Sequence, residues 1–205
     1  RYTPNAILKL SLREYVQGHG GQDTFTYHVE RTFDELGTIS GSYCSIFGIF
    51  YSKNKSQYSF PPKWGDTPKA ALKSILESIV DLIEAGAERD TKRIIDNQLA
   101  PMYKGKLLSL YYPELYLNIF SDEHLKYYLQ FFNQTSGGIL SKDPVLKRER
   151  LVEFKDKDDK HVITGKLLYE LEPSVKPSGN PLIDFEKNKS RLDYFIKNWF
   201  ANYEQ

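Results

Sequence analysis

Cysteine is almost missing from this chain of 205 residues, because Cys44 is the only one. A single thiol cannot form a disulfide within the chain, which favours a reducing compartment, so we expect a cytoplasmic protein. A membrane-spanning helix needs about 18 or more consecutive apolar residues, and no apolar run approaches that length. No signal peptide is recognisable at the start. The sequence therefore predicts no membrane partner.

The residue patterns of common metal and catalytic sites are also missing. One cysteine and four scattered histidines, at positions 19, 28, 124 and 161, provide no pair at zinc-ligand spacing. Residues 18–21 are glycine-rich but are not followed by the Lys-Ser/Thr of a phosphate-binding loop. No GxSxG pattern marks a nucleophile. We therefore expect no metal, no cofactor, no catalytic residue and no enzymatic activity.

One catalytic alternative stays open. Asp143, Glu153 and Lys155 loosely match the Asp…Glu-x-Lys spacing of metal-dependent nucleases. They lie in a highly charged segment, residues 142–160, whose pattern favours a helix with a solvated end. We keep the nuclease as the weaker alternative.

The chain has little net charge, since its formal value is +1, but the charge is uneven. Residues 43–74 contain five lysines and one acidic residue, whereas residues 75–100 contain six acidic and three basic residues. One face of a nearly neutral molecule is therefore expected to be basic.

Periodicity predicts a mostly helical α+β fold with a small antiparallel sheet or hairpin early in the chain. A turn at residues 53–56 joins the two hairpin strands, and Gly48 within the first indicates a bulge or a close approach. We expect one recognition domain over residues 1–205, belonging to a longer protein, with a sub-boundary in the Pro/Gly/Ser-rich residues 172–181. The expected helices are 5–16, 25–36, 68–85, 88–98, 121–132, 144–154 and 182–203, and the expected strands are 38–52, 57–60 and 106–110.

Aromatic residues and lysines alternate from Gly41 to Gly65, a stretch without an acidic residue. Aromatic rings beside cations suit the stacking of a base near its phosphates, although lysines lying over an aromatic core give the same pattern. The residues alone leave both interpretations open. For the binding interpretation, the candidate phosphate contacts are Lys53, Lys55, Lys63, Lys104 and Lys106. The candidate stacking residues are Tyr43, Tyr51, Tyr58 and Trp64.

A longer segment, residues 106–125 (KLLSLYYPELYLNIFSDEHL), resembles one found ahead of the motor in McrB-like AAA+ proteins of modification-dependent restriction systems. There a pattern near K-x-L-x-L-Y-x-P-x-x-x-x-x-I-x-S-x-x-H-L is followed by a helix. Residues 25–30, 36–41 and 47–51 are similar to N-terminal regions of that group. The resemblance covers roughly residues 25–132 and does not extend beyond residue 155.

The resemblance implies an N-terminal specificity domain that binds double-stranded DNA, often at a modified base, in phage defence. It also implies a GTPase motor in the same chain and a partner nuclease subunit. The modification, the pocket residues and whether a base is flipped do not carry over. The rival interpretation is a protein-interaction or assembly domain of a defence AAA+ protein, using the acidic residues 84–96 and the amphipathic residues 182–203.

Overall fold

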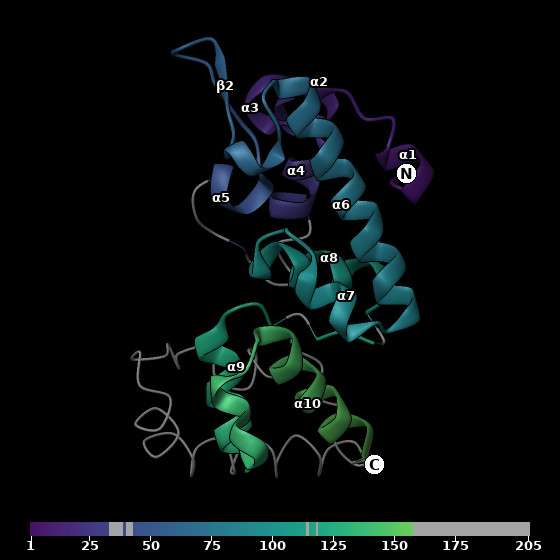
Figure 1. The fold of residues 1–205 in the computed structure, drawn as a ribbon, viewed down its shortest axis with the longest axis vertical. Coiled ribbons are helices and arrows are strands. Elements are labelled where there is room, and N and C mark those ends of the chain that lie inside the picture. Colours follow the sequence, from purple (N-terminus) through teal and green to yellow (C-terminus); the bar gives the residue numbers. More distant parts are fainter. Residues whose placement is uncertain (33–38, 40–42, 114, 118, 158–205) are drawn as a thin grey trace, which may run out of the picture. The chain divides into compact units, whose positions relative to one another are not determined.

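The computed structural model describes residues 1–32, 39, 43–113, 115–117 and 119–157. The chain divides into two compact units, Arg1–Tyr112 and Pro113–Gln205. Their described residues are mostly helical with one small antiparallel sheet, which confirms the predicted α+β class (Figure 1). The expectation of a single domain stays a prediction. Residues 172–181 and 182–203, the expected connection and last helix, lie outside the described residues.

The first unit holds the hairpin and most of the described helices. Its helices are α1 (Pro4–Ile7), α2 (Leu12–Tyr15), α3 (Gln17–Gly20), α4 (Phe25–Tyr27), α5 (Tyr43–Phe47), α6 (Pro68–Glu88), α7 (Thr91–Asp96) and α8 (Pro101–Tyr111). Its sheet pairs β1 (Phe50–Ser52) with β2 (Gln57–Ser59). Single turns of 3-10 helix, η1 (Gly21–Asp23) and η4 (Pro62–Trp64), and a π-helical turn, η2 (His28–Thr32), complete it.

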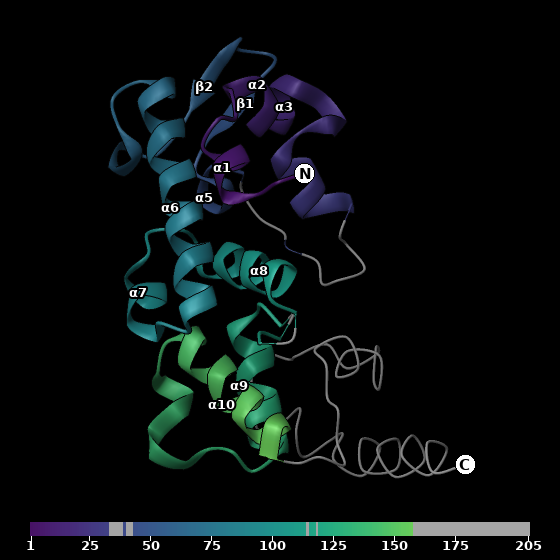
Figure 2. The ribbon, with the colours of Figure 1, turned by 90° about the vertical axis from the view of Figure 1, so that its right-hand side faces the viewer.

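Helix α6 is the framework of the first unit. It starts as predicted, because Thr67 caps it and Pro68 suits its first turn. The expected end at residue 85, before Gly86, was wrong: the helix continues to Glu88 and ends where Arg89 turns left-handed, with φ of 56°. A Cβ on Gly86 would lie 2.5 Å from Leu108 Cδ2, so this glycine allows close packing instead. Helix α6 contacts α1, α2, η4, α7 and α8 (Figure 2).

The expected strand over residues 38–52 was only partly right. Its last residues form β1, but Tyr43–Phe47 are helical because burial of Ile46 and Phe47 outweighs their β propensity. Gly48 then reverses the chain with φ of 81°, and a Cβ there would lie 2.8 Å from Ile75 Cδ1. The predicted mid-strand bulge, or approach by a backbone or ligand, was therefore wrong: Gly48 precedes β1, and the neighbour that approaches it is a side chain.

The expected strand over residues 106–110 was wrong, because these residues belong to α8. Every residue from Tyr103 to Ser109 is buried. A helix that is buried all round lacks the polar face that produces a helical period in the sequence. The short apolar run at residues 106–110 therefore suggested a strand.

The expected helix over residues 5–16 is interrupted. Leu8 ends α1, and Ser11 starts α2 through a capping box in which Ser11 and Glu14 bond each other's backbone amides. The expected helix over 25–36 begins at Phe25 but becomes the π turn η2, and residues 33–36 lie outside the described residues.

The second unit contains α9 (Asp122–Phe131), the 3-10 segment η5 (Ser136–Ser141) and α10 (Pro144–Lys157), which confirms both expected helices there. Apolar residues of these elements form its core. Asp122 pairs with Lys126 at 2.6 Å and with Lys147. Burial alone would raise the pKa of Asp122, but these bonds outweigh it and lower the pKa. Burial lowers the pKa of His124.

Candidate nucleic-acid interface

The hairpin forms where the sequence predicts it. Antiparallel β1 and β2 place Tyr51 opposite Tyr58, and the connecting turn, residues 53–56, has a bond from the Ser56 amide to the Lys53 carbonyl of 3.3 Å. Lys53 and Lys55 are exposed in this turn. Figure 1 shows the turn projecting beyond the helices of the first unit.

Three aromatic rings gather beside the turn. Tyr51 and Tyr58 lie 4.9 Å apart between ring centroids, and His19 stacks on Tyr51 at 4.7 Å with an interplanar angle of 18°. His19 Nδ1 also hydrogen-bonds the Tyr58 hydroxyl. His19 is exposed and both tyrosines are partly exposed. We call His19, Tyr51 and Tyr58 the ring cluster.

Helix α3 brings His19 to the hairpin because the neighbouring Gly18 allows the two backbones to approach closely. A Cβ on Gly18 would lie 2.5 Å from the Tyr51 carbonyl oxygen, so only glycine fits this approach without a shift. The Gln17 amide donates to Thr26 Oγ1 at 3.1 Å, and the buried Thr26 hydroxyl donates to the Tyr15 carbonyl at 2.8 Å. These bonds fix the start of α3. Sequence reasoning missed His19, whose only local signal is the surrounding glycines.

Cations and rings therefore lie close together at this end of the hairpin. Burial raises the pKa of Tyr58 above its ordinary value. The stretch from Gly41 to Gly65 has no acidic side chain that would repel a phosphate. This arrangement places two exposed lysines near partly exposed aromatic rings, and these are the residue types that contact phosphates and stack bases in nucleic-acid interfaces.

Two other predicted phosphate contacts were wrong. Lys104 is 4% exposed, and its ammonium donates to the carbonyls of Ile94, Ile95 and Asn97 at 2.8, 3.0 and 3.2 Å. It therefore caps the C-terminal end of α7. Lys106 is fully buried in α8. Neither ammonium is on the surface where a phosphate binds.

The three remaining predicted contacts, Trp64, Lys63 and Tyr43, differ in their surroundings. Trp64 is 3% exposed, so it serves as a core residue and not as a stacking platform. Lys63 is exposed, but its ammonium donates to the Gln98 carbonyl at 2.8 Å and lies 4.7 Å from the Trp64 ring centroid. Tyr43 begins α5, and its side chain lies outside the described part of the chain.

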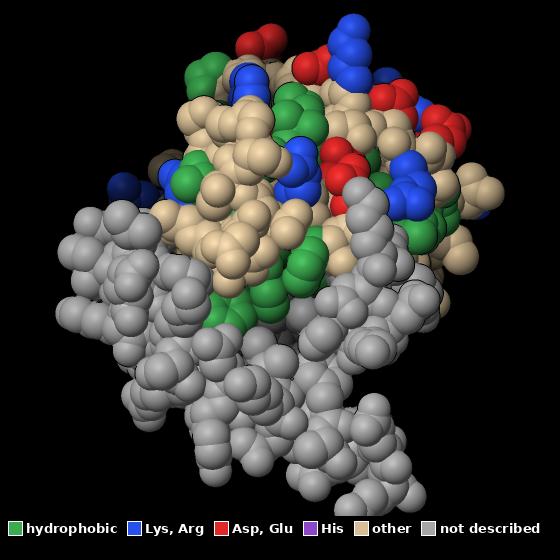
Figure 3. Space-filling view, turned by 90° about the horizontal axis from the view of Figure 1, so that it is seen from below, with side chains coloured by type: hydrophobic (Ala, Val, Ile, Leu, Met, Phe, Trp, Pro, Cys, Tyr) green, Lys and Arg blue, Asp and Glu red, His purple; other side chains and the backbone are tan. Residues whose placement is uncertain are grey.

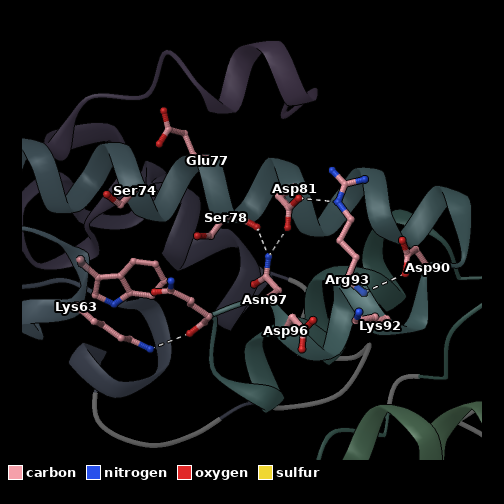
Figure 4. Close-up of a pocket in the computed structure, with 12 residues that line it drawn as sticks. Lys63, Ser74, Glu77, Ser78, Asp81, Asp90, Lys92, Arg93, Asp96 and Asn97 are labelled. Atoms are coloured by element: carbon pink, nitrogen blue, oxygen red, sulfur yellow. Dashed lines mark hydrogen bonds and ion pairs between the residues drawn. The ribbon is translucent and has the colours of Figure 1, made fainter.

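A polar groove of about 680 Å³ is lined by residues of η4, α6 and α7 (Figure 4). Arg93 lines it and pairs with Asp81, Glu84 and Glu88 at 2.7, 3.1 and 3.2 Å. The Asn97 side-chain amide donates to Asp81 Oδ2 and to the Ser78 carbonyl, at 3.0 and 2.8 Å. These bonds join the two helices and use much of the acidic region in which we expected partner binding.

The nuclease alternative receives no support from the geometry. Asp143 accepts a bond from the Val145 amide at 2.8 Å at the start of α10, whereas Glu153 lies near its other end and pairs with Arg150 at 3.8 Å. Ten residues of helix separate carboxylates by about 15 Å. The side chain of Lys155 lies outside the described residues. Within the described ranges, no three His, Cys, Asp or Glu side chains gather as metal ligands.

The surface drawn in Figure 3 has mixed charge. Among its coloured side chains, acidic and basic groups are interspersed and form no patch of one sign. The coloured side chains in this view therefore show no concentration of positive charge.

Across the residues that are described, no helix has both the length and the apolar character needed to cross a membrane. Comparisons with protein-family models, with curated proteins and with solved structures gave no match to this chain.

Proposed function

We propose that this chain is a DNA-recognition module that binds through its hairpin, without enzymatic activity of its own. The observation that carries the proposal is the ring cluster beside the exposed Lys53 and Lys55. The two ammonium groups contact phosphates, and the ring cluster stacks an exposed base. The resemblance of residues 25–132 to McrB-like proteins supports double-stranded DNA, modified or at a specific site, as the ligand. It also supports an AAA+ motor and a nuclease subunit as partners, in a cytoplasmic restriction system.

Salt dependence distinguishes phosphate binding from other association. Fluorescence anisotropy titrations of methylated and unmodified duplexes, each at several salt concentrations, give the slope of log affinity against log salt. Each phosphate contact contributes about 0.9 to this slope. The double variant Lys53→Ala/Lys55→Ala should therefore lower the slope by about 1.8 and weaken binding to all sequences alike.

The matched control removes the same charge elsewhere. Lys92 and Lys142 are both exposed, and Lys92→Ala/Lys142→Ala should leave the slope unchanged. An equal loss in both double variants would refute the hairpin as the site. Absence of salt-dependent binding to any duplex would refute DNA recognition altogether.

The rings are tested separately from the charges. His19→Ala removes an exposed ring from a short helix, so the core of the first unit should stay folded while the hairpin loses one of the contacts that order it. Loss of one stacked ring should cost about 1–3 kcal/mol of binding free energy while the salt slope stays constant. Unchanged affinity in His19→Ala would exclude the ring cluster from the interface.

A further inference from the structure

A second surface of the first unit is apolar and shares no residue with the hairpin or the ring cluster. Leu8 is 47% exposed, the only large apolar side chain that is exposed among the described residues. It borders a groove of about 830 Å³, with Leu10 on the same wall and the first half of α6 on the other. Leu72 and Leu76 line the groove and are 6% and 3% exposed, so they form its floor.

Local structure fixes the exposure of Leu8. The capping box of Ser11 and Glu14 starts a new helix, with the Ser11 amide donating to Glu14 Oε2 at 2.8 Å. Residues 8–10 therefore cannot continue the helical course of α1 into α2. Leu8 remains at the mouth of the groove, where the described residues of the chain leave it 47% exposed.

The rim of the groove is mainly basic. Lys69 and Lys73 are exposed on the α6 wall, and exposed Lys9 adjoins Leu8. The only acidic lining residue is Glu77, which lies 3.8 Å from Lys73 in an exposed ion pair that water screens. Lys69 also stands in the first turn of a helix of 21 residues, whose N-terminal end favours negative charge.

An apolar floor with a basic rim is complementary to an amphipathic helix that carries acidic residues. A nucleic acid has no aliphatic side chains to fill the floor. A lipid surface is too broad to reach Leu72 and Leu76, which lie below the mouth. The geometry points to a short acidic amphipathic helix of a partner protein, whose leucine-like side chains contact Leu8, Leu72 and Leu76. Its carboxylates then lie near Lys69 and Lys73.

Designed peptides test this docking site on the full chain. The probe is a labelled helical peptide of about four turns, with leucines at i, i+4 and i+7 and glutamates on either side of them. One comparison peptide has lysine at every glutamate position, and another has its leucines scattered over all faces. We expect anisotropy titrations to give a dissociation constant on the order of 10–100 µM for the acidic amphipathic peptide and binding about tenfold weaker for both others.

Variants locate the binding. Leu8→Asp changes an exposed residue, so folding is preserved, and Lys69→Glu/Lys73→Glu reverses the rim charge. Each should weaken the acidic peptide about tenfold, whereas Lys53→Glu/Lys55→Glu on the hairpin should leave it unchanged. DNA binding should be weakened by the hairpin variant and left unchanged by the groove variants. Failure of one proposal can therefore be recognised independently of the other.

Three results would overturn the proposal. Equal peptide affinity in Leu8→Asp and the unchanged chain would place the peptide elsewhere. Equal binding of the acidic and lysine peptides would show that the positive charge of the rim does not select the partner. Self-association in analytical ultracentrifugation that Leu8→Asp abolishes would assign the groove to a second copy of the chain.

Discussion

Replacement of Lys104 by methionine separates a structural lysine from a DNA-binding one. Methionine keeps a long side chain but removes the ammonium that donates to three carbonyls at the end of α7. The bond to Ile94 is buried, and those to Ile95 and Asn97 are partly buried. After the substitution, water can reach the last two carbonyls more easily than the first.

The expected loss follows from these three bonds. A buried carbonyl without its donor costs about 1–3 kcal/mol, and the partly buried ones cost less. Removal of the ammonium recovers part of its desolvation penalty. Together these effects predict a decrease of about 2–4 kcal/mol in the free energy of unfolding.

Urea denaturation followed by circular dichroism measures this loss. With a slope near 2 kcal/mol per molar urea, the midpoint of Lys104→Met should fall by about 1–2 M. The matched control Lys53→Met changes an exposed residue and should stay within about 0.5 kcal/mol of the unchanged chain. If Lys104→Met unfolds at the control's midpoint and loses DNA affinity, then Lys104 is a phosphate contact and our structural interpretation is wrong.

Three further outcomes are expected. Gly18→Ala forces α3 away from Tyr51, so it should lower DNA affinity without changing the salt slope; unchanged affinity would mean that α3 does not position the interface. Burial lowers the pKa of His124 below 6.5. The unfolded chain therefore takes up the proton more readily than the folded chain, and stability falls as pH drops below 6.5. In His124→Gln, the urea midpoint should change less between about pH 7 and pH 5. Despite the burial of Asp122, its ion pairs lower its pKa below 3.8. The stabilisation by these pairs is therefore present above pH 3.8 and is lost as pH falls through the lowered pKa. Asp122→Asn should remove this acid-dependent loss of stability, and an equal loss in the variant would refute the role of the ion pairs.

Local signals were sufficient to predict the hairpin turn and the start of α6. Residues 53–56 separate two short β-prone runs, and Thr67-Pro68 is a cap followed by a favourable first residue. Each of these signals acts within a few neighbouring positions, so it can be recognised without knowledge of the tertiary structure.

The candidate site was less predictable because it depends on contacts between distant residues. His19 and Tyr58 are 39 positions apart, and nothing near either residue indicates that they meet. Burial is also invisible in a local pattern, so Lys53 and Lys104 look alike in the sequence although one is exposed and the other caps a helix.

The shortness of β1 and β2 has a consequence for motion. Two strands of three residues each are marginal in water by themselves, so the ring cluster that attaches them to α3 supplies much of their order. Hairpin and α3 should therefore open together, with similar rates of amide hydrogen exchange and more rapidly than α6. Bound DNA should slow exchange in both and protect the Lys53 and Lys55 peptide bonds from trypsin.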